Sequence, residues 1–405
     1  MKSRSTRTDE MKRNFLIAVL SILPLTMLAD DHTSRHPANG DVTPSLTERV
    51  LQLEKNGELF NVYLHYSAHA QTSDEHGRWQ SAMGAKVFKV ELAGSLTDKL
   101  SYNFIHRLNK GTSAESQDNF ARATDGMSLT YDFNPQFSLT AGKTYQIWGG
   151  FEYWSSPVFV FQYSDMEDHM EIYTTGVVAR YKPVPSQEIG LEICNSHNGK
   201  FADTYSRLAE SGISQPLESP DHPFSFILNW NGNFFSDRLQ TRWAWGIQSE
   251  ARHRHSRMLA FGQQLCLPKF QWYVDYMAAF DGLDRLQLAS NEGRSYLKSS
   301  GRAYFTDVHY QTIVTKMEYQ FQPRWNLVFK GMYETANVTS DENFKNYRRS
   351  ISYGGFVEYI PDTQLNLHLF LGYMGKTLDY TRRSALTDIH TNRIELGFMS
   401  KLKLY

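Results

Sequence analysis

The feature that most constrains the fold is an alternation of apolar and polar residues with a period of two, which recurs along almost the whole chain. It is clearest between residues 127 and 192, where one run carries apolar side chains at Met127, Leu129 and Tyr131 and polar ones between them. A period of two is typical of a strand with one apolar and one polar face. Comparable runs start at Phe60 and continue to the last residues, so we expect an all-β chain.

The connections between these runs alternate in length. A short turn around Asn134 is followed by a long aromatic loop over residues 149–168, and then by another short turn around Pro183. Tight turns at one end and long loops at the other are typical of a membrane barrel. By the same reading we expect a short turn near Asn231 and a long loop near Arg252. A soluble β-sandwich would explain the alternation, but not this rhythm or the strand length.

The runs number about sixteen, each of roughly ten residues, which is the length that a tilted strand needs to cross a bilayer. Aromatic residues make up 14% of the chain, yet the mean hydropathy is −0.49. Beyond the N-terminus no segment approaches the roughly 20 apolar residues that a spanning helix needs. We therefore predict a transmembrane, antiparallel up-and-down β-barrel over residues 59–405, located in the bacterial outer membrane.

The N-terminus carries a separate pattern that indicates export. A basic pair precedes an apolar stretch that ends just before Ala29. This predicts a secretory signal peptide over residues 1–29, with Met11 as an alternative start, because the apolar stretch is too short for a transmembrane anchor. Residues 30–58 are expected to form a polar periplasmic leader and a short helix, since their second half has helix-like spacing of apolar residues.

Charge and cysteine content limit the partners. The formal net charge is −1, which gives no electrostatic reason to expect a nucleic-acid partner. The two cysteines, Cys194 and Cys266, are far apart in the sequence. Export would permit a disulfide between them, but two thiols without a spacing pattern favour unpaired side chains.

The polar face of each strand gives the residues expected to line the interior of the barrel. Cations and carboxylates occur there in nearly equal number, so we expect no strong ion selectivity from rings of one sign. Wall residues that are solvated and pair with one another are the simpler interpretation. The interior cations of most interest are Lys89, Arg107, Arg180, Arg242, Lys316 and Lys330.

The long loop over residues 149–168 is the best candidate for a functional segment. Gly149 and Gly150 form a plausible hinge, and Phe151, Tyr153 and Trp154 begin an aromatic run too apolar to lie free in water. Folded inward, this loop would narrow the barrel and set a size limit for whatever passes. Aromatic packing at a subunit interface is the alternative.

No residue pattern indicates catalysis or cofactor binding. His253 and His255 lie two residues apart without acidic or cysteine partners, which is a weak basis for a metal site; a basic loop that contacts surface anions is the simpler interpretation. Nucleophile motifs, glycine-rich phosphate loops and His-Glu metal helices are absent from the sequence. We expect no enzymatic activity, no metal and no cofactor.

Three short motifs carry a resemblance to a known family. They are Gly142-Lys143, the GGFEY run that starts at Gly149, and Cys194-Asn195-Ser196. In this arrangement the chain resembles the phosphate-selective porin O and P family, in its form from Bacteroidetes-type bacteria. The resemblance implies a sixteen-stranded, homotrimeric channel in the outer membrane. In that family phosphate selectivity rests on an inward ladder of arginines and lysines, which carboxylates interrupt here.

The resemblance and the lumen residues together imply a porin for passive diffusion of small hydrophilic or anionic solutes, with phosphate as one candidate. Arg107, Lys143, Arg180 and Arg242 would attract anions. Besides the solutes, outer-membrane lipids are the expected contacts. The alternative is a barrel whose long external loops bind a surface partner or polysaccharide without an open channel. An outer-membrane hydrolase would need a Ser and a His at the rim, and nothing in the sequence brings such a pair together.

Overall fold

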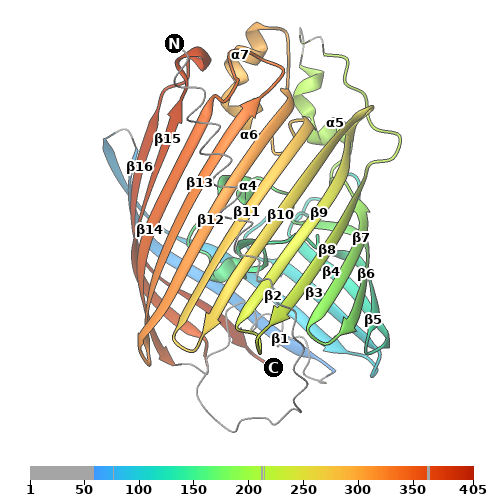
Figure 1. Ribbon diagram of the computed structural model, residues 1–405, viewed down its shortest axis with the longest axis vertical. Helices are drawn as coiled ribbons and strands as arrows, with labels where there is room; N and C mark the ends of the chain where they lie inside the picture. The colour runs from blue at the N-terminus through green and yellow to red at the C-terminus, as the bar shows by residue number, and fades with distance from the viewer. Residues whose placement is uncertain (1–58, 76, 211–212, 214, 363–364) are drawn as a thin grey trace. The chain divides into compact units, whose positions relative to one another are not determined.

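The computed structural model of the chain describes residues 59–75, 77–210, 213, 215–362 and 365–405. The predicted signal peptide, leader and short helix lie outside these residues. The described chain forms the predicted barrel. Neighbouring strands pair antiparallel, and the first strand pairs with the last, so the sheet has no edge (Figure 1).

Sixteen strands make up the barrel, as the sequence predicts. They are β1 (Asn61–Glu75), β2 (Arg78–Ser95), β3 (Leu100–Arg107), β4 (Thr124–Asn134), β5 (Phe137–Tyr145), β6 (Tyr173–Val184), β7 (Gln187–Asn195), β8 (Phe224–Phe234), β9 (Leu239–Ala251), β10 (Arg254–Leu267), β11 (Phe270–Leu283), β12 (Thr306–Gln322), β13 (Trp325–Val338), β14 (Arg348–Asp362), β15 (Leu367–Tyr380) and β16 (Ile389–Lys403).

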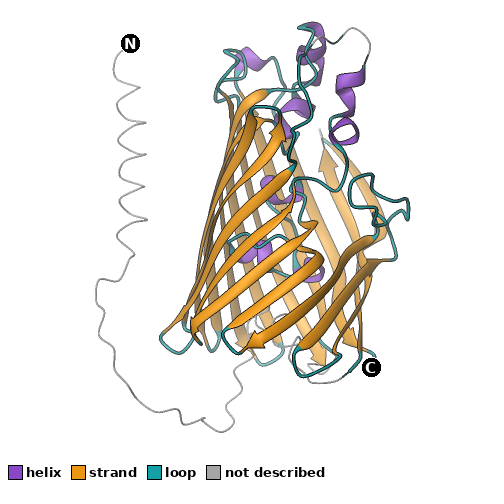
Figure 2. Cartoon of the chain, turned by 90° about the vertical axis from the view of Figure 1, so that its right-hand side faces the viewer, coloured by secondary structure: helices purple, strands orange, loops and turns teal. Residues whose placement is uncertain are grey.

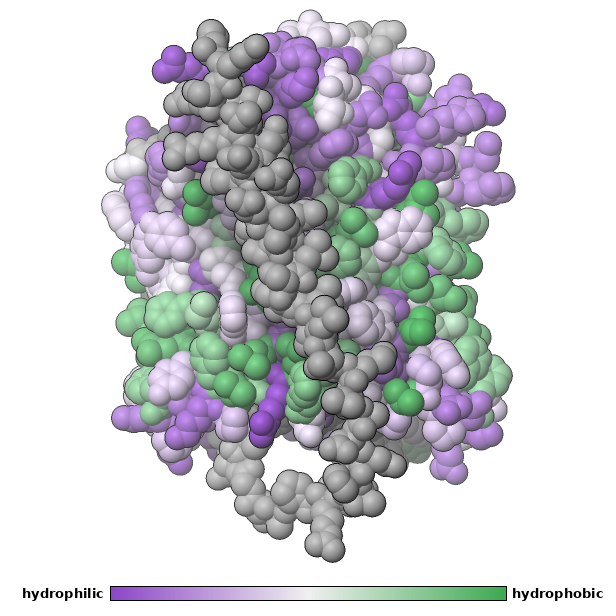
Figure 3. Space-filling model, viewed as in Figure 1, coloured by the Kyte–Doolittle hydropathy of each residue, from purple (hydrophilic) through white to green (hydrophobic). Residues whose placement is uncertain are grey.

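The outer face of the barrel is apolar, because every second residue of a strand points away from the interior. Large side chains on this face, among them Leu129, Val177, Leu191, Phe226 and Trp245, are 39–47% exposed. Figure 3 shows hydrophobic side chains gathered around the middle of the barrel and hydrophilic ones towards its two ends. This is the surface that a bilayer covers.

Aromatic side chains cluster beside the short turns. The rings of Phe133 and Phe137 lie 5.4 Å apart across the turn between β4 and β5, and those of Trp325 and Tyr359 lie 4.7 Å apart near the turn between β12 and β13. Rings at this level suit the interface between lipid and water.

The short helices lie within the loops. Five belong to loops drawn at the end opposite the C-terminus in Figure 1. They are α5 (Phe201–Thr204), η3 (Ser206–Ala209), α6 (Leu288–Glu292), α7 (Arg294–Ser299) and η4 (Arg382–Ser384). In a barrel of this kind that end is the external one. Within the described residues no helix is both long and apolar enough to cross a membrane.

Two of the connections named in the sequence analysis differ from the expectation. The long loop expected near Arg252 is a two-residue turn, since His253 adopts a left-handed φ of 61° that lets β9 continue to Ala251 and β10 begin at Arg254. The short turn expected near Asn231 lies further on, at residues 235–238, because β8 extends to Phe234. Cys194 and Cys266 form no disulfide with each other, as predicted.

Candidate functional site

The connection between β5 and β6 folds into the barrel instead of extending outward. It carries α3 (Phe151–Trp154), η2 (Pro157–Phe159) and α4 (Asp165–Asp168). Figure 2 shows the short helices of this segment between the walls, about halfway along the strands. We refer to residues 146–172 as the inward loop. It contains the glycines and aromatic residues that the sequence analysis singled out.

The inward loop enters the barrel through its two glycines. A Cβ added to Gly149 would lie 2.5 Å from the carbonyl oxygen of Arg242 and 2.8 Å from that of Ala260, so the close approach to β9 and β10 needs glycine. Gly150 has a φ of 96°, and its N–H donates to the same Arg242 carbonyl at 2.9 Å. The glycines therefore place the loop directly on the wall.

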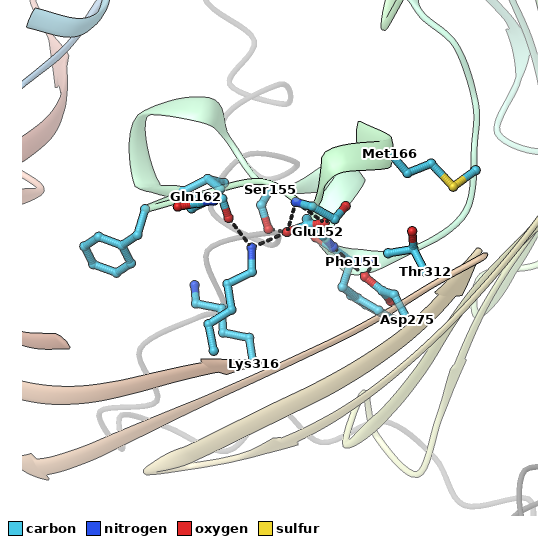
Figure 4. Close-up of polar contacts among 12 residues, drawn as sticks. Phe151, Glu152, Ser155, Gln162, Met166, Asp275, Thr312 and Lys316 are labelled. Carbon is cyan, nitrogen blue, oxygen red and sulfur yellow. Dashed lines mark hydrogen bonds and ion pairs between the residues drawn. The ribbon is translucent and has the colours of Figure 1, made fainter. Parts of the chain in front are cut away.

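One carboxylate on the barrel wall accepts hydrogen bonds from the backbone at the start of α3. Asp275 Oδ2, on β11, accepts hydrogen bonds from the backbone N–H groups of Phe151 (2.8 Å) and Glu152 (2.7 Å), as Figure 4 shows. The Glu152 side chain accepts from the Ser164 hydroxyl at 2.6 Å and forms an ion pair with Lys330 of β13. Lys330 Nζ also donates to the carbonyl of Gln162 at 2.5 Å. These contacts connect both ends of the segment 151–164 to two strands.

A second set of charges holds α4. Glu334 on β13 accepts hydrogen bonds from the N–H groups of Asp165 (3.1 Å) and Met166 (3.2 Å), which are unpaired at the start of a helix. The Asp165 carboxylate pairs with Arg348 and Lys376. Burial of Asp165 opposes its charge, but these two cations lower its pKa below the ordinary value. The helix is thus fixed to β13, β14 and β15.

Glu167 lies among these groups and has a different environment. Both of its carboxylate oxygens are buried and have no hydrogen-bond partner within the described residues. Burial, together with the nearby charges of Glu152 and Asp275, raises the pKa of Glu167 well above its ordinary value. This environment favours the neutral form of the side chain over the charged form.

Apolar packing completes the contact between the inward loop and the wall. The ring of Phe161 stacks on Phe356 of β14 with centroids 3.7 Å apart and meets Phe370 of β15 edge-on at 5.1 Å. Lys86 of β2 donates to the carbonyls of Val160 and Phe161 from the other side. The buried residues of this cluster are Val87, Phe151, Val158, Phe159, Phe161, Tyr273, Val314, Val328, Met332, Phe356, Phe370, Met374 and Met399.

The apolar patch on the inner wall is a feature that the sequence analysis missed. Strict alternation assigns polar residues to the interior, whereas Val328, Phe356 and Phe370 occupy interior positions and are at most 6% exposed. A signal was present in the sequence, since each of these residues adjoins an outward apolar residue and so interrupts the alternation. The inward loop covers the patch, which would otherwise face water.

The structure also places each predicted lumen cation. Five of them lie within 4.0 Å of a carboxylate: Arg107 with Asp125, Lys143 with Asp118, Arg180 with Glu188, Lys316 with Glu318 and Lys330 with Glu152. Arg242 donates to Asn233 and to the Thr241 carbonyl and lies over the Phe151 ring. Lys89 is 3% exposed.

Lys143 lies apart from the inward loop. It is buried against residues 108–123, with Nζ 2.9 Å from Asp118 and 5.5 Å from the centre of the Phe120 ring. The predicted cations therefore do not converge on one point. No group of three or more His, Cys, Asp or Glu side chains in the described part of the chain is arranged to hold a metal ion.

A closed sixteen-stranded barrel with an apolar outer belt and a loop seated in its interior defines a porin-type protein of the bacterial outer membrane. The sequence model of the phosphate-selective porin O and P family matches residues 60–401, so the chain belongs to that family. It is a channel through which small solutes pass by passive diffusion.

Solved structures support the fold at low sequence identity. The outer membrane channel DcaP of Acinetobacter baumannii has a TM-score of 0.56 at 10% identity, covering 85% of this chain and 97% of its own. OmpF of Salmonella typhi has a TM-score of 0.55 at 10% identity. The match covers 85% of this chain and 98% of the OmpF chain. An anion-selective porin from Comamonas acidovorans has a TM-score of 0.54 at 7% identity. The match covers 85% of this chain and 99% of that porin. A comparison with curated protein sequences finds no match.

Proposed function

We propose that this porin is a weakly selective diffusion channel for small hydrophilic solutes, with the inward loop setting its size limit. The observation that carries the proposal is the pairing of charges inside the barrel. Arg107, Lys316 and Lys330 each have a carboxylate beside them, so their fields are largely compensated at the distance of a passing ion. A strong anion filter needs a row of arginines whose charges are not compensated, and these contacts do not form such a row.

The size limit follows from how firmly the inward loop is held. Buried ion pairs, backbone hydrogen bonds and stacked rings connect it to strands β2, β9, β11, β13, β14 and β15. A segment with this many specific contacts occupies one position, so it removes a fixed part of the cross-section. Phosphate is one of several solutes that such an opening would admit, and small anions are admitted together with neutral solutes.

We further propose that the protein assembles as a homotrimer and contacts outer-membrane lipids through the rest of its apolar face. Strands β3, β5 and β7 have 8, 9 and 9 residues, whereas β12 has 17. The short strands are at or just below the lower limit of the roughly 9–11 residues that a tilted strand needs to cross a bilayer. A neighbouring copy of the chain on this side would cover the outer face of the short strands, which are too short for lipid to cover fully. Cross-linking of the protein in native membranes tests the subunit count.

Single-channel recording of the refolded protein in planar bilayers tests the channel proposal. Open steps with a reversal potential near zero in a potassium chloride gradient, and little block by added phosphate, are the expected result. A strongly anion-selective reversal with phosphate block would replace weak selectivity with a specific anion pathway. A folded barrel without open steps would instead favour the alternative, in which external loops bind a surface partner.

The proposal includes no enzymatic activity. The charged groups at the inward loop, such as Glu152 and Asp275, are engaged in holding backbone and lysine groups. Turnover of a lipid or peptide substrate by purified protein, lost on substitution of a rim Ser or His, would contradict this part of the proposal.

A further inference from the structure

A cavity of about 310 Å³ lies among the external loops, away from the contacts that seat the inward loop. Its lining comes from the end of the inward loop, from the connection after β7, from β9 and from the connection after β11. Polar side chains predominate, and Leu286 is the one apolar residue among them. Pockets that hold small molecules begin at about 300 Å³, so the cavity is large enough for one. The lining residues used below are Ser196, Thr204, Gln248, Arg285, Gln287 and Asn291.

An ion-pair network in the wall of the cavity, which includes the lining residues Glu171 and His197, makes its shape definite. The ring of His197 lies between two carboxylates, with Nδ1 3.0 Å from Glu171 and Nε2 2.8 Å from Glu250. Tyr205 donates its hydroxyl to Glu250 at 2.7 Å and meets the His197 ring edge-on. Three parts of the chain are joined here, and each buried polar group that is satisfied in this way restricts the others.

Side chains on the other side of the cavity are fixed as well. Gln287 donates to the Thr204 carbonyl at 2.9 Å, which connects the loop after β11 to α5. Arg207 donates to the Ser290 carbonyl at 3.0 Å and to Asn291 Oδ1 at 3.2 Å while its guanidinium lies over the Tyr304 ring. Because the polar groups are held before any solute arrives, little ordering would be needed on binding.

Two buried donors that line the cavity have no partner within the described residues. They are the hydroxyl of Ser196, a residue that is 2% exposed, and Nε of Arg285, a residue that is 9% exposed. The Arg285 Nε lies 3.7 Å from Asp281 Oδ1, which is beyond hydrogen-bonding distance. A buried polar group without a partner costs free energy, so these positions favour an incoming oxygen atom.

The charges around the cavity indicate the class of that solute. His197 is matched by Glu171 and Glu250, and Arg285 has Asp281 beside it. Two cationic groups stand against three carboxylates, which leaves no positive excess for an anion and at most one negative charge, so a fully charged solute would gain little and would lose its hydration. The remaining capacity is a mixture of amide, hydroxyl and guanidinium groups, which can donate and accept around a solute that does both.

We propose that this cavity is a docking site for an uncharged, polyhydroxylated solute of the size of a mono- or disaccharide, on the external side of the inward loop. The inference rests on the proposed function only in that such a solute would be one that the channel admits. The hydroxyls would accept from Ser196 and Arg285 and exchange hydrogen bonds with Gln287 and Asn291.

Saturation-transfer NMR of the folded protein in detergent, with glucose and maltose as probes and inorganic phosphate as competitor, tests the proposal. We expect saturable transfer to at least one sugar. Loss of one or two hydrogen bonds in Gln287→Leu or Ser196→Ala is expected to weaken binding by about fivefold or more. The matched control is Gln311→Leu, which replaces an exposed amide on β12 outside the cavity. Ser196→Ala removes only a hydroxyl and carries the test if Gln287→Leu does not fold.

Three results would overturn the proposal. The first is no saturation transfer to either sugar from folded wild-type protein, and the second is wild-type affinity for the sugar in both cavity variants. The third is displacement of the sugar by phosphate at a concentration below that of the sugar, which would assign the site to an anion on Arg285. Channel recordings on the same preparations separate the two proposals. Open steps without sugar binding reject the docking site alone, whereas folded protein without open steps rejects the proposed function.

Discussion

Lys330 on β13 forms an ion pair with Glu152 of the inward loop across 178 residues of sequence, and both side chains are at most 2% exposed. The pair joins the loop to the wall at the point where α3 begins its contact with Asp275. Removing one partner of a buried pair leaves the other charge without compensation, which is costlier than removing both.

The variant Lys330→Met is therefore expected to release the loop. Loss of the lysine alone should destabilise the seated loop by about 3–5 kcal/mol, the usual range for a broken buried pair. Single-channel recordings should show larger or fluctuating conductance. The double variant Lys330→Met, Glu152→Gln should recover part of the loss, and Lys345→Met, which breaks an exposed pair with Glu342, serves as the control. Unchanged, quiet conductance in Lys330→Met would show that the pair does not hold the loop.

Gly149→Val tests the entry of the loop by sterics alone. The new side chain would start 2.5 Å from the Arg242 carbonyl oxygen, and backbone atoms cannot move aside as a flexible side chain can. We expect the loop to be displaced while the barrel still closes, giving altered conductance with normal strand content by circular dichroism. Gly84→Val is the matched control, because nothing lies within 4 Å of a Cβ at that glycine. Equal conductance in the two variants would exclude the close approach as a constraint.

Phe161→Ala tests the apolar contact. The substitution removes a ring stacked 3.7 Å from Phe356 and should cost about 3–5 kcal/mol, as for other buried phenylalanines. Phe161→Leu, which keeps most of the volume, should cost clearly less. Thermal denaturation followed by gel mobility gives the comparison. Equal midpoints for the two variants would mean that the contact is not closely packed.

Asp125→Asn tests whether pairing explains weak ion selectivity. The substitution removes the negative charge beside Arg107. It removes the same charge from Lys110, whose Nζ lies 3.8 Å from Asp125. The uncompensated cations should shift the reversal potential in a potassium chloride gradient towards anion preference, and more so at low salt because screening is weaker there. Asp237→Asn, in the turn between β8 and β9, should have no effect. A shift of the same size in both variants would refute a local cause.

The network around His197 should make the stability of the external loops depend on pH. Burial alone would lower the pKa of His197, but Glu250 and Glu171 raise it to about 10. Because the folded-state pKa is raised, the stabilisation is complete below the ordinary value of 6.5 and is lost as the pH rises through about 10. The melting midpoint of wild-type protein should therefore fall relative to that of His197→Gln between pH 6.5 and 10. Parallel profiles would contradict this assignment.

Much of the architecture could be predicted from local pattern. Alternation at Met127, Leu129 and Tyr131 predicted outward side chains, and in the structure all three residues are 41–47% exposed. The aromatic run at Phe151 and Tyr153 predicted a loop that avoids water, and both residues are buried. The turn expected near Asn231 lies at residues 235–238, and the connection near Arg252 is a short turn instead of a long loop. The alternation does not reveal the left-handed φ values, at residues 235–237 and at His253, that decide where these strands end.

The sequence by itself determined the strands of the barrel, its lipid-facing belt and which segment folds inward, because strand periodicity and the apolar character of a loop are local properties. Only the tertiary structure decided which charges pair. Glu152 meets Lys330, and Asp165 meets Arg348 and Lys376, through contacts between residues far apart in the chain. The same holds for the covered apolar patch and for the polar cavity, since the position of a loop over a distant wall depends on packing that no local pattern encodes.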